Sequence, residues 1–350
     1  MIMKKFYTIF AIAALMLAAC AEPEPEQPVV PTPTPDEEAE QTPAVYFTYG
    51  GAADETRTAM GTPKEDGTSR FVWVEGDKVG VSCKELEKYN HMVTVPANTN
   101  GGEYYNTSFN THLLFKDATT EHTFYLYYPY NTNSSATSTI VEGSIPSNQN
   151  GDLSKSDFMW DIVTTTAANP RVSGQMIHPH AYLRFYIVDA STKDNNGAAT
   201  TIAGKKVNAI SIVGEGALTG TFKADLGSFD RKNPYNNVLQ FTSTQSNAAT
   251  LTYPADAAYN TVLDKTAWES KKVEKNHPVM VVNPAGINGK NFKIDVAIEG
   301  LPVFEVALSG KTIESGKFYN ISLGGLKQTD GSLKLTVIGW TEIQGSVEFE

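Results

Sequence analysis

Alternating apolar and polar residues recur along this chain, in runs too short to form helices. Every second residue is apolar over residues 45–49, 183–187 and 292–298. Clusters of glycine, proline, asparagine and aspartate separate such runs. Alternation with a period of two between turn-forming clusters is typical of half-buried β-strands in sandwich folds. The pattern therefore predicts an all-β chain.

Other runs of the same kind extend the predicted strands over the whole chain after residue 44. Further strands are expected at residues 71–74, 124–128, 304–308, 319–323 and 333–337. Gly300 and Pro302 predict a hairpin turn before the strand at 304–308. One helical turn or a loop is expected around residues 152–160, and residues 261–275 have a weak helical periodicity. The two cores are expected to include Trp73, Phe124, Leu126, Phe185, Ile294 and Val306.

The first 20 residues have the pattern of a secretory signal that ends at a cysteine. Lys4 and Lys5 precede an apolar run of about a dozen residues, which is shorter than the ~20 residues that a membrane span needs. The tetrad at residues 17–20, Leu-Ala-Ala-Cys, resembles a bacterial lipobox. We therefore expect a signal peptide over residues 1–19 and acyl chains, such as palmitate, on Cys20. The alternative is an ordinary signal peptide with an incidental cysteine.

Residues 20–43 are predicted to form a disordered tether. Residues 21–43 hold seven prolines, seven acidic residues and no basic residue. Proline-rich chains favour an extended geometry of ~3.1 Å per residue, so this segment can reach about 70 Å. Its acidic start at Glu22, Glu24 and Glu26 resembles signals that send lipoproteins to the outer face of the outer membrane. The alternative is a solvated spacer.

Charge and cysteine content narrow the function further. The net charge of the chain is −11, and removal of Lys4 and Lys5 makes it −13, which does not suit a nucleic-acid partner. Because Cys20 is the expected lipid site, Cys83 is left without an intramolecular disulfide partner.

The length of the chain suits two domains, with a break near residues 169–174. We therefore predict β-sandwich domains at 44–173 and 174–350.

No motif in the sequence points to catalysis or to a cofactor. The motifs of zinc proteases, serine hydrolases, nucleotide-binding loops and dithiol redox centres are absent. His178 and His180 have the spacing of two metal ligands on a strand, but no third ligand accompanies them, so we favour a structural role. The aromatic run at residues 124–130 is interpreted as a core strand rather than a sugar-stacking platform. The chain is not expected to be an enzyme.

Several short segments, taken together and in order, resemble the fimbrillin family, the lipoprotein subunits of type V pili in certain anaerobic Gram-negative bacteria. The segments that carry the resemblance are Thr56-Arg57-Thr58, Trp73-Val74-Glu75-Gly76-Asp77-Lys78-Val79-Gly80-Val81, Tyr127-Tyr128-Pro129-Tyr130, Asp157-Phe158-Met159-Trp160, His180-Ala181-Tyr182-Leu183-Arg184-Phe185, Gly316-Lys317-Phe318-Tyr319-Asn320-Ile321 and Trp340. They span nearly the whole chain after the tether. Trp160 and Tyr182 stand where the family pattern suggests smaller residues.

The resemblance implies two transthyretin-like β-sandwich domains, export as an outer-membrane lipoprotein, cleavage after an arginine, and assembly with other pilus subunits by strand exchange. Cell adhesion through a surface ligand is also implied, without a cofactor. The alternative function is a surface lipoprotein that does not polymerise and binds a glycan or a host protein.

Arg57 is the candidate cleavage site, because it is the first basic residue after Cys20 and follows a polar, glycine-containing stretch. Cleavage there would remove the tether and the strand that carries Val45, Phe47 and Tyr49. We expect that loss to leave an open sheet edge above an apolar groove. Val347 and Phe349 alternate with glutamates in the C-terminal tail and form the candidate donor strand for a neighbouring subunit.

Overall fold

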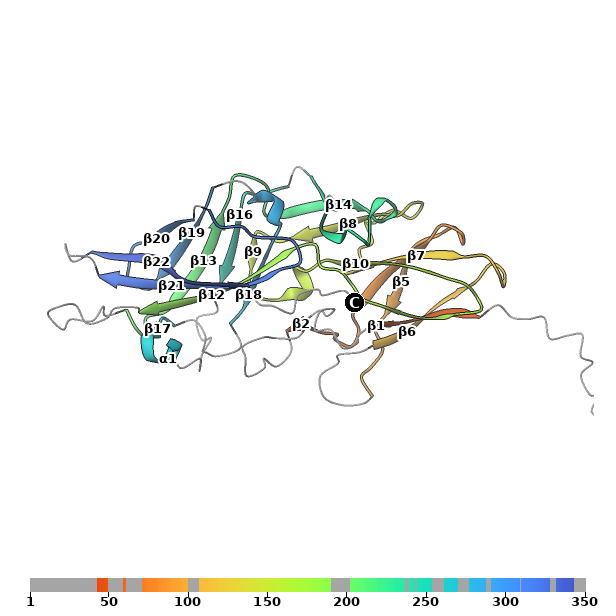
Figure 1. The fold of residues 1–350 in the computed structure, drawn as a ribbon, viewed down its shortest axis with the longest axis horizontal. Coiled ribbons are helices and arrows are strands. Elements are labelled where there is room, and N and C mark those ends of the chain that lie inside the picture. Colours follow the sequence, from red (N-terminus) through yellow and green to blue (C-terminus); the bar gives the residue numbers. More distant parts are fainter. Residues whose placement is uncertain are drawn as a thin grey trace, which may run out of the picture. The chain divides into compact units, whose positions relative to one another are not determined.

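A computed structural model describes residues 43–49, 59–60, 71–99, 107–189, 202–236, 239–242, 244–253, 261–269, 277–287, 291–308, 310–327 and 332–342. All of them belong to one unit that spans Thr42–Glu350. Strands make up most of these residues, and the α-helix among them, α1 (Lys265–Glu269), is only five residues long. The weak helical periodicity at 261–275 thus corresponds to one short helix, and the all-β prediction is confirmed (Figure 1).

Two sheets near the start of the chain pack face to face. One has the order β11-β1-β6, and the other has the order β10-β7-β4-β5. Their bounds are β1 (Ala44–Tyr49), β4 (Lys78–Cys83), β5 (Lys88–Thr94), β6 (Thr107–Leu114), β7 (His122–Tyr128), β10 (Met159–Thr165) and β11 (Arg171–Gly174). The side chains between these sheets form a first core around Phe47, Trp73, Phe109 and Phe124. This is the sandwich that the alternation predicts.

Two larger sheets enclose a second core. One has the order β17-β12-β21-β22 with β18 also paired to β12, and the other has the order β20-β19-β13-β16-β9. Their bounds are β9 (Asn148–Gln149), β12 (Ala181–Asp189), β13 (Val207–Val213), β16 (Ala248–Thr252), β17 (Leu263–Asp264), β18 (Val279–Val282), β19 (Phe292–Ile298), β20 (Phe304–Leu308), β21 (Phe318–Lys327) and β22 (Leu333–Glu342). The predicted hairpin is confirmed, because β19 and β20 pair in antiparallel register.

The remaining elements are small. A three-stranded sheet has the order β15-β14-β8, and β2 pairs with β3. Their bounds are β2 (Ala59–Met60), β3 (Phe71–Val72), β8 (Ile140–Ile145), β14 (Gly220–Asp225) and β15 (Gln240–Phe241), and the 3-10 turns are η1 (Leu153–Lys155), η2 (Leu226–Ser228), η3 (Pro234–Asn236) and η4 (Pro284–Gly286). The predicted strand at 71–74 is therefore too long, since it ends at Val72 before the turn at Gly76, whose φ is +88°.

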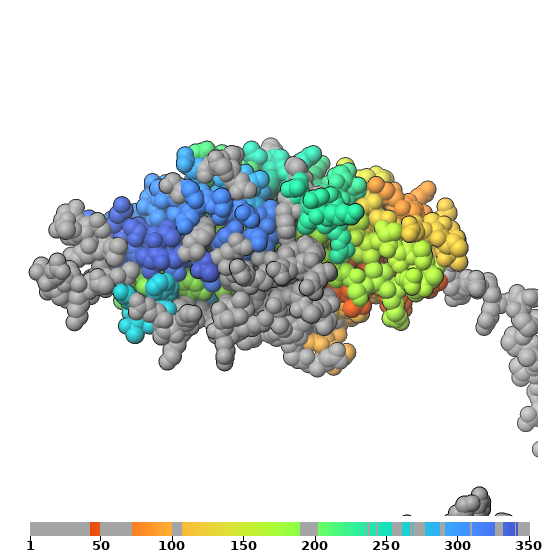
Figure 2. Space-filling view, in the orientation of Figure 1, coloured from red at the N-terminus to blue at the C-terminus, as the bar shows by residue number. Residues whose placement is uncertain are grey.

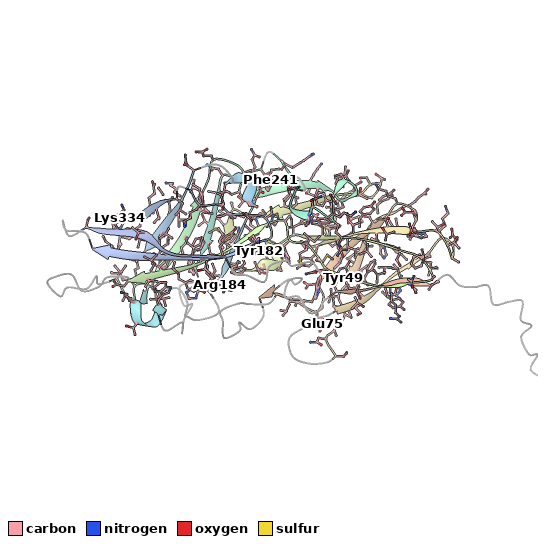
Figure 3. All side chains as sticks on the ribbon, in the orientation of Figure 1. Tyr49, Glu75, Tyr182, Arg184, Phe241 and Lys334 are labelled. Atoms are coloured by element: carbon pink, nitrogen blue, oxygen red, sulfur yellow. The ribbon has the colours of Figure 1, made fainter. Side chains whose placement is uncertain are left out.

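A third core joins strands from both parts of the chain. β7 directs Phe124, Leu126 and Tyr128 into the first core and Tyr125 and Tyr127 into the third. β12 likewise directs Leu183, Phe185 and Ile187 into the second core and Tyr182 into the third. Figure 3 labels Tyr182 and its strand neighbour Arg184 on β12. A strand with cores on both faces buries consecutive residues, which explains the continuous aromatic run of β7.

The predicted core residues are all buried, with Trp73, Phe124, Leu126, Phe185, Ile294 and Val306 each at most 6% exposed. The two sandwich cores confirm the predicted fold class. The boundary between residues 173 and 174 stays a prediction. β8 and β9 precede that boundary in sequence but pair with β14 and β16, which follow it.

Candidate functional site

The first strand, β1, occupies the middle of its sheet. Its residues Tyr46–Tyr49 pair in parallel with Arg171–Gly174 of β11. On the other side, β1 pairs in antiparallel register with β6, so that Phe47 lies opposite Phe109. The expectation of an open sheet edge after loss of this strand stays a prediction, and the structure extends it from one edge to two. Its loss would open a slot with an unpaired strand on each side.

The inner face of β1 is apolar and fully enclosed. Val45, Phe47 and Tyr49 are each 0% exposed, as their alternation predicts. The ring of Phe47 lies 5.5 Å from Phe124 and 6.1 Å from Phe109, and the ring of Tyr49 lies 5.8 Å from Phe109. Aromatic pairs at such distances add to the stabilisation from buried apolar area. The slot around β1 is thus shaped for large side chains at alternate positions.

A buried polar network holds the end of β1. The Tyr49 hydroxyl donates a hydrogen bond to Asp161 Oδ2 at 3.1 Å, across from β1 to β10. Asp161 Oδ1 lies 2.7 Å from Arg231 Nη1 and accepts from the backbone N–H of Ile162 at 2.8 Å. Arg231 Nη1 also donates to the carbonyl oxygen of Ile162 at 3.1 Å. Figure 3 labels Tyr49 at the start of this network.

Gly174 of β11 leaves the space that this network needs. A Cβ atom at residue 174 would lie 2.4 Å from Asp161 Oδ2 and 2.6 Å from the Tyr49 ring. Both distances are far below van der Waals contact, and both neighbours are fully buried. Any side chain larger than a hydrogen atom at this position would therefore displace the Tyr49–Asp161 contact.

The electrostatics of the network are dominated by burial. Burial raises the pKa of the Asp161 carboxyl from 3.8 to about 6, although the charge of Arg231 and the hydrogen bonds from Ile162 and Tyr49 act in the opposite direction. Burial, together with the negative charge of Asp161, raises the pKa of the Tyr49 hydroxyl well above its usual value. Tyr49 therefore stays protonated and acts as the hydrogen-bond donor.

The other predicted assembly residues lie outside the described part of the chain. These are Cys20, Arg57, Val347 and Phe349. Lipid attachment, cleavage and strand donation at these positions stay predictions. In sequence, Arg57 falls between the end of β1 at Tyr49 and the start of β2 at Ala59.

The two histidines that resembled a metal pair lie in different environments. His178 Nδ1 is 3.1 Å from an Asp157 oxygen and 2.6 Å from the Tyr182 hydroxyl, which itself donates to Asp157. His180 is fully buried, with its ring 5.5 Å from Phe222, and burial lowers its pKa to about 4. Within the described ranges, no three His, Cys, Asp or Glu side chains are grouped as a metal site.

Two further sequence interpretations concern buried residues. The side chains of Tyr125, Tyr127 and Tyr128 are all buried, so β7 presents no stacking platform for a sugar. Cys83, which the sequence leaves without an intramolecular disulfide partner, is also buried, and burial raises the pKa of its thiol to about 12. Neither feature supplies chemistry at the surface.

Asp161, Arg231 and Gly174 were not predicted as site residues. Asp161 did carry a signal, because it is an acidic residue inside the apolar run at 158–163. An acidic side chain in a strand whose sequence predicts burial needs a hydrogen-bond donor or a positive charge beside it. Its partners Tyr49 and Arg231 are distant in sequence, so the pattern alone could not have named them.

Comparison with known proteins assigns the chain to a family. The family model described as fimbrillin-like matches residues 56–340. The chain therefore belongs to the fimbrillin-like family. This match covers both sandwiches from β2 onward, whereas β1 precedes it.

Solved structures are similar to this chain at low sequence identity. A crystal structure described as a candidate cell adhesion protein from Bacteroides uniformis is 17% identical, with a TM-score of 0.52, over 85% of this chain and 97% of that one. The tip fimbrial protein Mfa3 from Porphyromonas gingivalis is 8% identical, with a TM-score of 0.38, over 86% of this chain and 99% of that one. No curated protein sequence matches the chain. Among the described residues, no helix is long and apolar enough to span a membrane.

Proposed function

We propose that this chain is a structural subunit of a cell-surface pilus or adhesive fibre, and that it assembles by exchange of its first strand. The observation that carries the proposal is the position of β1, which fills a slot between β6 and β11 and is the first described strand of the chain. Membership of the fimbrillin-like family supports the same role. The proposed role is structural and not catalytic.

The maturation step that we propose is cleavage after Arg57, following export as a lipoprotein anchored at Cys20. The cut would separate β1 and the tether from the rest of the chain. An incoming strand would then regain backbone hydrogen bonds on two sides, to β6 and to β11, rather than on one. Two ladders fix the position of an inserted strand more strongly than a single open edge does. A candidate donor is the tail that carries Val347 and Phe349, supplied by a neighbouring subunit.

Limited proteolysis of the purified chain with an arginine-specific protease tests this proposal. We expect a new N-terminus at Thr58 and a ladder of multimers on gels run without boiling. Arg57→Gln should stay uncut at this position and monomeric, whereas Arg70→Gln, a matched control, should behave as the parent chain. A chain that is cut after Arg57 but keeps β1 and stays monomeric would contradict strand exchange.

The donor and the anchor are tested by separate variants. The double variant Val347→Asp, Phe349→Asp should be cut after Arg57 but form no ladder, because aspartates do not fit an apolar slot. Cys20→Ala should leave the membrane fraction or remain as the unprocessed precursor, because lipid anchoring depends on burial of acyl chains in the membrane. Normal membrane retention of Cys20→Ala would rule out the anchor without bearing on the exchange.

A further inference from the structure

A polar cleft lies on the outer face of the small sheet β15-β14-β8. Its volume is about 440 Å³. The residues that line it include Ile140, Lys223, Asp225, Phe229, Asn236 and Gln240. Figure 2 shows β14 and the segment that follows it, in teal, at the molecular surface. The volume falls within the range of about 300–1,000 Å³ that is usual for small-ligand sites.

Strand register brings these side chains together. β14 buries Phe222 and Ala224, so Lys223 and Asp225 point to the opposite, exposed face. Gln240 of β15 lies directly opposite Lys223, and Ile140 of β8 lies directly opposite Asp225. Residues from three neighbouring strands thus share one face at adjacent positions.

The turn after β14 contributes Ser228 and Phe229 to the lining of the cleft. Asp225 Oδ1 caps η2 by accepting from the backbone N–H of Gly227 at 3.0 Å, and it also accepts from the Thr139 hydroxyl at 2.7 Å. These bonds fix the point at which the chain leaves the sheet. Phe229 follows η2, and its ring packs edge-on against buried Trp160 at 4.8 Å. The aromatic side of the cleft is therefore held by the third core.

Several polar groups of the cleft remain available to a ligand. Asp225 Oδ2 and the side chains of Lys223, Asn236 and Gln240 form no hydrogen bond with the described part of the chain. Together they offer a carboxylate acceptor, an ammonium donor and two amides that both donate and accept. Ile140 adds an exposed apolar surface, with 41% of its area accessible.

We propose that this cleft binds neutral carbohydrate. The cleft holds one positive side chain, Lys223, and one negative side chain, Asp225. A charged ligand would be attracted by one of them and repelled by the other, whereas a neutral ligand is repelled by neither. Mixed donors and acceptors match sugar hydroxyls, each of which both donates and accepts. Ile140, with a small contribution from the accessible part of Phe229, offers apolar surface to the C–H face of a sugar ring. None of the lining residues named here belongs to β1, so the proposal does not depend on strand exchange.

The test is binding of the purified, uncut chain to an array of neutral, sialylated and sulfated oligosaccharides. The best neutral oligosaccharide is then titrated by calorimetry. We expect binding to neutral glycans, and we expect Lys223→Ala and Gln240→Ala each to weaken the affinity about tenfold, as loss of one ligand hydrogen bond does. Lys88→Ala, an exposed lysine of β5, is the matched control and should bind as the parent chain does.

Three results would overturn the inference. In the first, the chain binds no glycan on the array. In the second, it binds sialylated or sulfated glycans but no neutral one. Alternatively, neutral glycans can bind with equal affinity to the parent chain and to the double variant Lys223→Ala, Gln240→Ala, which would place the sugar elsewhere. Both residues are exposed, so neither change should prevent folding, and equal melting temperatures would verify this. Failure of glycan binding would leave the cleavage and ladder experiments unaffected.

Discussion

Replacement of Asp161 by asparagine tests whether burial or the charge of Arg231 has the larger effect on the pKa of Asp161, and so on the stability of the fold. The carboxylate lies 2.7 Å from Arg231, which by itself suggests a stabilising ion pair. Yet the Asp161 side chain is 0% exposed, whereas that of Arg231 is 37% exposed. Water screens the charge of Arg231, whereas the Asp161 carboxylate has lost its hydration. The cost of burying the carboxylate therefore outweighs its attraction to Arg231. The asparagine side chain would keep an oxygen acceptor for Tyr49 and lose the charge.

The raised pKa fixes both the sign and the size of the effect. In the folded chain the pKa of Asp161 is about 6, against an ordinary value of 3.8. Between these two values the folded state binds more protons than the unfolded state, so the stability from this group falls as pH rises. The difference of roughly two pKa units corresponds to about 3 kcal/mol. At pH 4 the carboxyl is already about half ionised in the unfolded state, so part of this cost is present there, and the cost disappears only well below pH 3.8.

The assay is urea unfolding of the parent chain and of Asp161→Asn at several pH values from 4 to 8. The stability of the variant minus that of the parent should increase by about 2 kcal/mol between pH 4 and pH 6.5, and then change little up to pH 8. Asp117→Asn is the control, because hydrogen bonds from Thr120 and Thr119 lower the pKa of that exposed carboxyl. Its difference from the parent should stay constant over this pH range. A difference for Asp161→Asn that is constant or decreases would refute the reasoning and show that Arg231 stabilises the anion.

Four smaller measurements test the packing and the expectation that the fold does not depend on a bound metal. Tyr49→Phe should lower the free energy of unfolding by about 1–2 kcal/mol, because a buried Asp161 oxygen loses its donor; an unchanged urea midpoint would contradict this. Gly80→Ala should cost about 1–3 kcal/mol, since its Cβ would lie 2.0 Å from the Tyr127 ring; thermal unfolding measures it. Cys83 should react with a thiol reagent only after unfolding, so rapid native labelling would refute its burial. A chelator should leave the melting temperature unchanged, and a shift would reveal a metal site.

The strands could be predicted where apolar and polar residues alternate regularly, because there the strand packs against a core with one face. Leu183, Phe185 and Ile187 were predicted to share a face, and they do so because that face of β12 covers the second core. The opposite face of the same strand was not predicted. Tyr182 and Arg184 are buried there as well, because the third core lies on that side. An alternating pattern identifies a strand but not whether its second face is solvated.

The position of β1 could not be predicted for a related reason. Its three apolar residues specify a strand with one buried face, and an edge strand or a central strand satisfies that pattern equally. Its neighbours β6 and β11 begin about 60 and 130 residues after it in the chain, and no local signal indicates such pairing. The partners of Asp161 were hidden in the same way, although its place in an apolar run marked it as unusual.

The shape of the slot limits which strand can replace β1. β1 places an aliphatic residue, a phenylalanine and a tyrosine at alternate positions, and the tyrosine hydroxyl supplies a donor to Asp161. In the C-terminal tail, Ile343, Gly345, Val347 and Phe349 occupy alternate positions, and none of these side chains has a hydrogen-bond donor.

A tail inserted in this register would fill the apolar part of the slot and leave Asp161 Oδ2 without its bond from Tyr49. An ionised carboxylate in that state is costly, but a protonated one is not, because it can itself donate. Strand exchange by this tail should therefore be favoured near or below pH 6, where Asp161 takes up a proton. If ladder formation after cleavage is instead equally efficient at pH 5 and pH 8, the donor must carry its own polar group opposite Asp161, and a segment other than this tail becomes the better candidate.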